Sequence, residues 1–189
     1  PVRLLMERTA VFEATGPTPG GWVWVKIGVD NSGKITAAES DIRFDAGAYP
    51  GSPVGAAAMC VFAPYHIENT RVDFWDIVAN KPKTAPYRAP GSTHAAFATE
   101  SVIDEICEKI GMDKIEFRVM NGAKEGTRRS DGPIFQRIGA IETIEAARDT
   151  DHWQTPLQQN ASNGKRPGRG IASGFFFNIG LKSSVNLSV

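Results

Sequence analysis

The clearest alternation of apolar and polar residues lies between residues 22 and 46. One face of its first half carries Val23, Val25, Ile27 and Val29, and the other carries Trp22, Trp24 and Lys26. Such period-two alternation is typical of a half-buried β-strand. Residues 31–34 have turn chemistry, because Gly33 can adopt a positive φ, and residues 35–46 continue with Ile42 and Phe44 on a common face. We therefore predict a β-hairpin.

Three other segments have the composition of strands. Residues 2–12 are rich in Val, Leu and Thr, and glycines and prolines separate them from the hairpin. Residues 70–79 and residues 170–178 are predicted as two further strands. Between the second and third of these, residues 80–91 contain three prolines and are predicted to form a loop.

Two helices are predicted between the hairpin and residue 111. Residues 54–62 are small and apolar, which suits a tightly packed helix. A longer helix is expected to begin at a cap on Ser92 or Thr93 and to run to about Ile110, where Gly111 would end it as a C′ glycine. Its apolar stripe comprises Phe97, Val102, Ile103, Ile106 and Ile110.

Two shorter helices follow. Asp113 and Glu116 resemble a capping box with Asp in the Ser/Thr position, which predicts a helix to about Asn121. Residues 138–150 predict another. Its inward positions are expected to be Ile141, Ile144 and Ala147.

The order of these elements favours an α+β fold, with mixed β-sheets and helices packed against them, over a strict βαβ alternation. A chain of 189 residues accommodates one domain or parts of two. We predict a boundary near Arg137, with residues 1–137 ending one domain and residues 138–189 beginning a second. Both ends resemble interrupted strands, so we expect an internal fragment of a longer protein.

Composition excludes several classes of function. Lys and Arg total 21 and Asp and Glu total 21, whereas nucleic-acid binders usually have a basic excess. Apolar runs are too short to cross a bilayer, and no signal-peptide layout is present. The two cysteines, Cys60 and Cys107, are too few for an iron–sulfur or zinc site, which indicates buried free thiols. We expect a cytoplasmic protein, with the periplasm as the alternative for the parent.

The segment with the clearest chemical potential comprises residues 86–93. Its prolines stiffen the backbone, Gly91 allows close approach of a bulky partner, and Arg88 adds a positive charge. The start of the predicted helix behind it presents unpaired N–H groups suited to an anion, a phosphate or a metal-oxo oxygen. The alternative is a rigid connector in which Arg88 pairs with a carboxylate. A generic phosphate or nucleotide site is also open, although no dinucleotide or P-loop glycine pattern occurs.

The chain resembles the large subunits of the molybdenum hydroxylases, which include xanthine dehydrogenase, aldehyde oxidase and carbon monoxide dehydrogenase. Five landmarks in the family's order carry this resemblance. They are residues 1–8 (PVRLLMER), 45–49 (DAGAY), 87–91 (YRAPG), the helix with Glu100 and Ile103-Asp104, and 111–121 (GMDKIEFRVMN).

The resemblance implies roles for individual residues. Arg88, with its main chain near the metal's ligands, would bind the cofactor together with Tyr87, Ala89 and Gly91, and Pro90 would face the substrate. Purine-oxidising members have a Phe where this chain has Pro90, and an upstream Arg whose place falls on Ala56 by ungapped count. Both departures argue against xanthine as the substrate and leave a small aldehyde, a different heterocycle or an unrelated substrate open.

The implied parent hydroxylates a C–H bond with oxygen from water at a molybdenum–molybdopterin centre, with the cofactor in its plain or its cytosine dinucleotide form. Its partners would be FAD and 2Fe-2S subunits or domains, the rest of the same large subunit and a small-molecule substrate, with no nucleic acid and no membrane. The family's catalytic Glu would lie outside this chain, so we expect no catalytic residue and no metal ligand here, and Glu100 and Glu105 are expected to be surface or helix-packing residues.

One alternative to this interpretation concerns the whole chain, and a separate assignment concerns its three histidines. A non-catalytic structural or interaction module derived from the family would keep the loop for packing alone. His66, His94 and His152 have no metal-binding spacing and are assigned structural roles, although His94 lies beside the Tyr-Arg segment.

Overall fold

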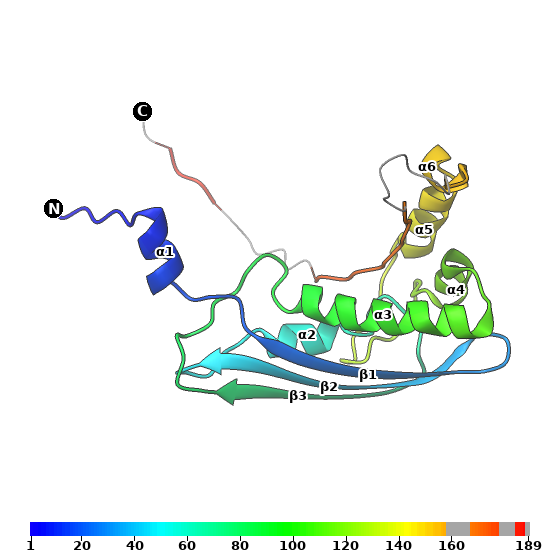
Figure 1. The fold of residues 1–189 in the computed structure, drawn as a ribbon, viewed down its shortest axis with the longest axis horizontal. Coiled ribbons are helices and arrows are strands. Elements are labelled where there is room, and N and C mark those ends of the chain that lie inside the picture. Colours follow the sequence, from blue (N-terminus) through cyan, green and yellow to red (C-terminus); the bar gives the residue numbers. More distant parts are fainter. Residues whose placement is uncertain (158–166, 178–183, 188–189) are drawn as a thin grey trace.

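A computed structural model describes residues 1–157, 167–177 and 184–187 of the chain (Figure 1). The helices and strands follow one another in the order α1 (Arg8–Ala14), β1 (Gly21–Val29), β2 (Ile35–Gly47), α2 (Val54–Cys60), β3 (Asn69–Val78), α3 (Ser92–Ile110), α4 (Lys114–Asn121), α5 (Ala140–Arg148) and α6 (Asp151–Gln154). The strands form one sheet, and α2 and α3 lie on the same side of it. The α+β class with a mixed sheet is therefore confirmed.

The predicted hairpin is present, with β1 antiparallel to β2. Its turn is built around Asp30, whose carboxylate accepts hydrogen bonds from the backbone N–H groups of Ser32 and Lys34 at 2.8 and 3.0 Å. Gly33 adopts the expected positive φ, 88°. The third strand, β3, runs parallel to β2, so β2 is the central strand of the sheet.

The core lies between the sheet and the helices. Ile42 and Phe44 of β2 are fully buried, as the period-two pattern predicts, and Ile103 of α3 is fully buried opposite them. Both cysteines are buried free thiols within this core. Burial of such side chains supplies the main stabilising term for a fold of this size.

The connection from α3 to α4 confirms two local predictions. Gly111 ends α3 in the left-handed conformation at φ 69°. The Asp113 carboxylate then accepts hydrogen bonds from the N–H groups of Ile115 and Glu116, and α4 starts at the next residue. The two helices meet at an angle that lets the inner side of α4 reach α3 (Figure 1).

A buried amide fastens α4 to the hairpin turn. Asn121 accepts a hydrogen bond from the N–H of Ile35 at 2.8 Å, and its own amide nitrogen donates to Gly33 and Phe117 carbonyls at 3.0 Å each. Every polar atom of this buried side chain therefore has a partner.

Two predicted strands are wrong. Within residues 2–12 the structure forms the exposed helix α1, and residues 170–177 form neither helix nor strand; residue 178 lies outside the described residues. An apolar composition does not by itself choose strand over helix or other extended backbone. The N-terminal segment has no sheet edge beside it and forms local helical bonds instead.

The predicted details of α3 and α5 also need correction. The N-cap of α3 is Gly91 and not Ser92 or Thr93, because the Ser92 hydroxyl donates to the carbonyl of Phe175. Phe97 and Ile110 are exposed, so the buried stripe of α3 is narrower than predicted. The helix over 138–150 is shorter, and its inward positions Ile141, Ile144 and Ala147 are only half-buried or exposed.

In the part of the chain that the structure describes, no helix has the length and apolar character needed to cross a bilayer.

Candidate functional site

The loop before α3 is anchored at its N-terminal side against the end of β2. Backbone bonds join Thr84 N–H to the Ala46 carbonyl at 3.1 Å and Ala48 N–H to the Lys81 carbonyl at 2.9 Å. The Lys81 ammonium also contacts the Asp45 carboxylate at 2.6 Å. Prolines occupy positions whose N–H groups the sheet does not need, so the loop leaves the sheet edge with a stiff backbone.

At its C-terminal side the loop is held by a strained turn. Ala89 has φ 49°, which is the one positive φ of a non-glycine residue in the described segments, and the N–H of Ser92 closes the turn on its carbonyl at 3.1 Å. Gly91 has φ 80°, and a Cβ there would lie 2.5 Å from the carbonyl oxygen of Pro53. Only glycine fits this contact with the start of α2.

Between these two anchors, the loop presents its side chains to solvent. Tyr87 is 73% exposed, and Arg88 is also exposed. Among the described residues no carboxylate forms an ion pair with Arg88, so the pairing proposed for a mere connector is not found there. The guanidinium therefore remains available to an anionic group.

The crevice beside the loop is small. Its lining includes Tyr87, Arg88, Pro90, Gly91 and His94, and its volume is about 10 Å³. That is room for roughly one water molecule. These residues thus form one wall and not an enclosed pocket. Of the predicted site residues, Tyr87, Arg88, Pro90 and Gly91 line this crevice and Ala89 does not, and the roles predicted for them stay predictions.

Two features behind the loop suit a polar ligand. The N-cap of the 19-residue helix α3 is a glycine and provides no side-chain cap, so the first-turn N–H groups receive no bond from it. The ring of His94, in that first turn, packs against the ring of Phe44 in a tilted arrangement with centroids 4.8 Å apart. Its Nδ1 is buried and has no hydrogen-bond partner among the described residues.

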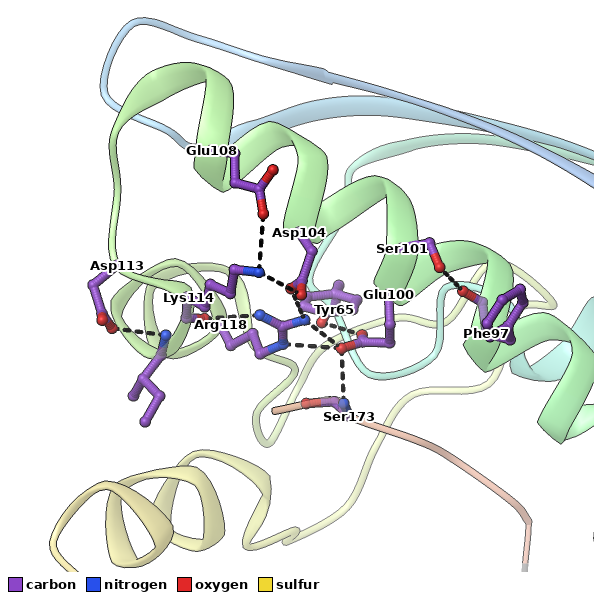
Figure 2. Close-up of polar contacts among 11 residues, drawn as sticks. Tyr65, Phe97, Glu100, Ser101, Asp104, Glu108, Asp113, Lys114, Arg118 and Ser173 are labelled. Carbon is purple, nitrogen blue, oxygen red and sulfur yellow. Dashed lines mark hydrogen bonds and ion pairs between the residues drawn. The ribbon is translucent and has the colours of Figure 1, made fainter. Parts of the chain in front are cut away.

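A second polar cluster lies in the interior between α3 and α4 (Figure 2). The Glu100 carboxylate accepts hydrogen bonds from Arg118 Nε at 2.9 Å and Nη2 at 2.7 Å, and from the Ser173 N–H at 2.8 Å. The Tyr65 hydroxyl donates to its other oxygen. Glu100 is 6% exposed and Arg118 0%, so both charges are buried and fully hydrogen-bonded.

The cluster continues toward solvent through Asp104 and Lys114. Asp104 accepts from Arg118 Nη2 at 2.9 Å and from Lys114 Nζ at 2.7 Å. Burial acts to raise the pKa of Asp104, but the bonds from Lys114 and Arg118 outweigh it and lower the pKa overall. Burial and the adjacent Glu100 charge hold the pKa of Tyr65 well above its usual value. For Arg118, burial acts to lower the pKa, but the Glu100 charge and the hydrogen bonds to Asp104 and Glu100 outweigh it and raise the pKa.

The sequence prediction for these glutamates was partly informative. Glu105 is exposed and Glu100 packs between helices, as expected, but the partner of Glu100 was missed. A signal was available: Glu100 and Asp104 are four residues apart on α3, and Lys114 and Arg118 are four apart on α4. Such spacing places each pair on one helix face.

An apolar groove lies on the other side of the 171–175 segment. It has a volume of about 520 Å³, and its walls come from residues 63–64, from α5 and the residues before it, and from the 171–175 segment itself.

The histidines form no metal site in the described residues. His66, His94 and His152 do not gather in a common group, and the described residues contain no cluster of three or more potential metal ligands.

Comparison with known proteins decides the family. The model of the molybdopterin cofactor-binding domain matches residues 1–122, which include the loop, α3 and α4. The chain belongs to the molybdopterin cofactor-binding domain family. Within this family it is 30% identical, over 99% of its length, to the aldehyde oxidoreductase molybdenum-binding subunit PaoC of Escherichia coli O157:H7, and covers 26% of that protein. It is 27% identical over 79% of its length to the nicotinate dehydrogenase large molybdopterin subunit of Eubacterium barkeri, covering 36% of that protein.

Solved structures of the molybdopterin cofactor-binding domain family share the fold. The aldehyde oxidoreductase of Desulfovibrio desulfuricans superposes with a TM-score of 0.64 at 29% identity, over 70% of this chain and 15% of that one. The family resemblance inferred from the sequence is thus confirmed. The chain spans about a quarter of the length of the curated relative PaoC. The predicted domain boundary near Arg137 and the roles of individual loop residues stay predictions.

Proposed function

We propose that this chain forms one wall of the cofactor pocket in the large subunit of a molybdenum-dependent hydroxylase. The observation that carries the proposal is the loop of residues 86–91, which is anchored on both sides and exposes Tyr87 and Arg88 in front of the start of α3. Membership of a cofactor-binding family supports this interpretation, because the loop lies inside the matched region.

The residues present fit a molybdenum–molybdopterin group, in its plain or cytosine dinucleotide form. The N–H groups at the start of α3 and the Arg88 guanidinium suit phosphate and other anionic oxygens. Gly91 keeps the backbone against α2, where a Cβ would collide, and the unpartnered Nδ1 of His94 offers one more polar atom. When bound, such a group supplies the two-electron oxidation of a C–H bond with oxygen from water.

What this chain contributes to the reaction is binding and orientation. Tyr87, Arg88, Ala89 and Gly91 would hold the cofactor through the rigid main chain together with the Arg88 guanidinium, and Pro90 would limit the substrate side. A proline offers no aromatic face for stacking, which favours a small aldehyde or a heterocycle other than xanthine. No residue of this chain is proposed as the catalytic base.

The rest of the assembly is inferred from the relatives. We expect the parent's large subunit to complete the pocket, and FAD and 2Fe-2S subunits or domains to carry electrons away. A cytoplasmic location is part of the same proposal. Relatives named as molybdenum-binding subunits support a separate large subunit in the parent.

The test uses the full-length parent subunit, expressed with cofactor supply and compared with Arg88→Ala and Gly91→Ala variants. We expect about one molybdenum and one pterin per large subunit in the wild type, and turnover of aldehydes or N-heterocycles. Arg71→Ala is the matched control, because Arg71 is an exposed arginine on β3 paired only with Asp73. Loss of cofactor in the loop variants but not in this control supports the proposal.

The alternative is a non-catalytic module in which the loop serves packing alone. It predicts a folded parent without molybdenum or pterin under the same conditions. It also predicts that Arg88→Ala changes nothing measurable. The exposure of Tyr87 and Arg88 favours the cofactor-binding proposal, because a packing loop would bury its large side chains.

A further inference from the structure

Residues 171–177 run beside α3 without joining a strand (Figure 1). The N–H of Ser173 donates to Glu100 at 2.8 Å, and the carbonyl of Phe175 accepts from the Ser92 hydroxyl at 2.5 Å. Phe175 and Phe177 also pack against the hydrophobic core. The segment, which we call the strap, is therefore fastened to one helix at two points.

Further contacts hold the middle of the strap. The ring of Phe175 meets that of Phe135 edge-on with centroids 5.5 Å apart. The Arg129 guanidinium lies 5.1 Å from the Phe175 ring centroid, within the range of a cation–π contact. These contacts keep the Phe175 carbonyl in reach of Ser92 without any sheet bond.

The second fastening point is the residue that ends the candidate loop. Ser92 is buried, and its N–H bonds the carbonyl of Ala89, which is held at φ 49°. A non-glycine residue keeps such a conformation only where its surroundings determine it. Ser92 thus connects the two segments, because its hydroxyl bonds the strap and its backbone N–H bonds the strained turn.

We infer that Ser92 is a positioning residue through which the strap, docked on Glu100, sets the conformation of the 86–91 loop and of the group that the loop holds. The identity of that group rests on the proposed function. The coupling between strap and loop does not depend on it. Neither the family match nor the relatives' names assign any role to Ser92 or to the strap.

The informative variant is Ser92→Ala, because it removes one hydroxyl and leaves the buried Glu100 cluster intact. Replacing Glu100 itself would remove the buried carboxylate partner of Arg118, leave it paired with the partly exposed Asp104, and endanger the fold. Ser101→Ala is the matched control. Ser101 lies on the same helix, and its hydroxyl also donates to a backbone carbonyl, that of Phe97 at 2.7 Å, but this bond stays within α3 and does not join the strap to the loop.

The first measurement is amide hydrogen exchange in the full-length parent subunit with its partners. For Ser92→Ala we expect exchange about fivefold faster, the size of effect of one lost hydrogen bond, at the hydrogen-bonded amides of the two segments, that of Ser173 in the strap and that of residue 92 at the end of the loop. Ser101→Ala should leave both segments unchanged. Faster exchange in the strap with an unchanged loop would overturn the inference, because the two segments would then be independent.

The second measurement is the EPR spectrum of the reduced, molybdenum-loaded subunit. A displaced loop changes the surroundings of the metal, so Ser92→Ala should alter the line shape of the Mo(V) signal. A purely structural loss would weaken the signal and keep its shape, which would count against the inference. If the parent carries no molybdenum, the proposed function fails, whereas the exchange measurement still decides the coupling.

Discussion

Glu100 and Arg118 are 18 positions apart in the chain, and Arg118 donates two hydrogen bonds, at 2.9 and 2.7 Å, to a single oxygen of the Glu100 carboxylate. They join the middle of α3 to α4 (Figure 2). Because Arg118 is fully buried, neither charge can be left alone without a large cost.

Removing one partner of this pair should therefore destabilise the protein strongly. For Arg118→Met we expect a loss of about 3–5 kcal/mol in the free energy of unfolding, because the Glu100 carboxylate stays buried without its cation. Urea denaturation of wild type and variant measures this. Arg43→Met is the control, since Arg43 is an exposed arginine paired with Asp41, and should cost less than about 1 kcal/mol. Equal losses in the two variants would contradict the prediction.

The pair also predicts a pH dependence through Tyr65. Burial raises the pKa of the folded Tyr65 above its ordinary value of 10, so the unfolded chain loses this proton first as the pH rises. The contribution of Tyr65 to the free energy of unfolding is therefore fully present below pH 10 and declines above it. In unfolding measured between pH 8 and roughly 11, Tyr65→Phe should be less stable at neutral pH but show a shallower alkaline decline. An identical alkaline slope in both proteins would argue against it.

Asp104 predicts the opposite dependence at acid pH. Its folded pKa is lowered, so its contribution is present above the unfolded value of 3.8 and is lost as the pH falls through the folded value. Asp104→Asn should therefore flatten the loss of stability below about pH 4. Because the carboxylate is partly exposed, the effect should be modest and smaller at high salt.

Asn121 offers a test of the hairpin anchor. Asn121→Ala removes one acceptor and two donors of hydrogen bonds to Ile35, Gly33 and Phe117. We expect a loss of about 2–4 kcal/mol in unfolding free energy, because the freed N–H of Ile35 stays buried. Exchange of that amide should accelerate more than exchange elsewhere in β2. A loss below about 1 kcal/mol would show that water replaces the amide.

Two glycines with positive φ allow a matched comparison of strain and contact. At Gly111, φ is 69° and an added Cβ meets nothing within 4 Å, so Gly111→Ala should cost about 1 kcal/mol. At Gly91, φ is 80° and the Cβ would meet backbone of Pro53 and Ala57 at 2.5 and 2.7 Å. Gly91→Ala should therefore cost clearly more, as thermal unfolding of the two variants would measure. Similar losses of stability in the two variants would contradict the prediction, because the loop would then shift to accommodate the added Cβ.

Local patterns predicted the elements in which each residue's neighbours in sequence decide the structure. The hairpin over residues 22–46 follows from alternation and turn chemistry, and Gly111 and Asp113 mark the ends of α3 and α4. The wrong strand at residues 170–177 has a different cause. Its backbone finds partners in the side chains of Glu100 and Ser92, which no local pattern reports.

The candidate site also combines features that the sequence predicted with features that only the packing of distant segments decides. The Tyr87–Gly91 segment stood out in the sequence because prolines, a glycine and an arginine precede a helix, and the family match covers it. Its exposure, the strain at Ala89 and the tight contact of Gly91 with α2 depend on segments tens of residues away. Those contacts were beyond prediction because they arise only when separate elements pack together.

By itself the sequence determined the α+β class, the hairpin, the end of α3, the start of α4 and the family, since periodicity, capping and short motifs act within a few residues. The tertiary structure alone decided that Glu100 meets Arg118 and that Ser92 bonds the strap instead of capping its own helix. Such choices depend on which buried polar groups need partners once the core has formed, and burial is a property of the whole fold.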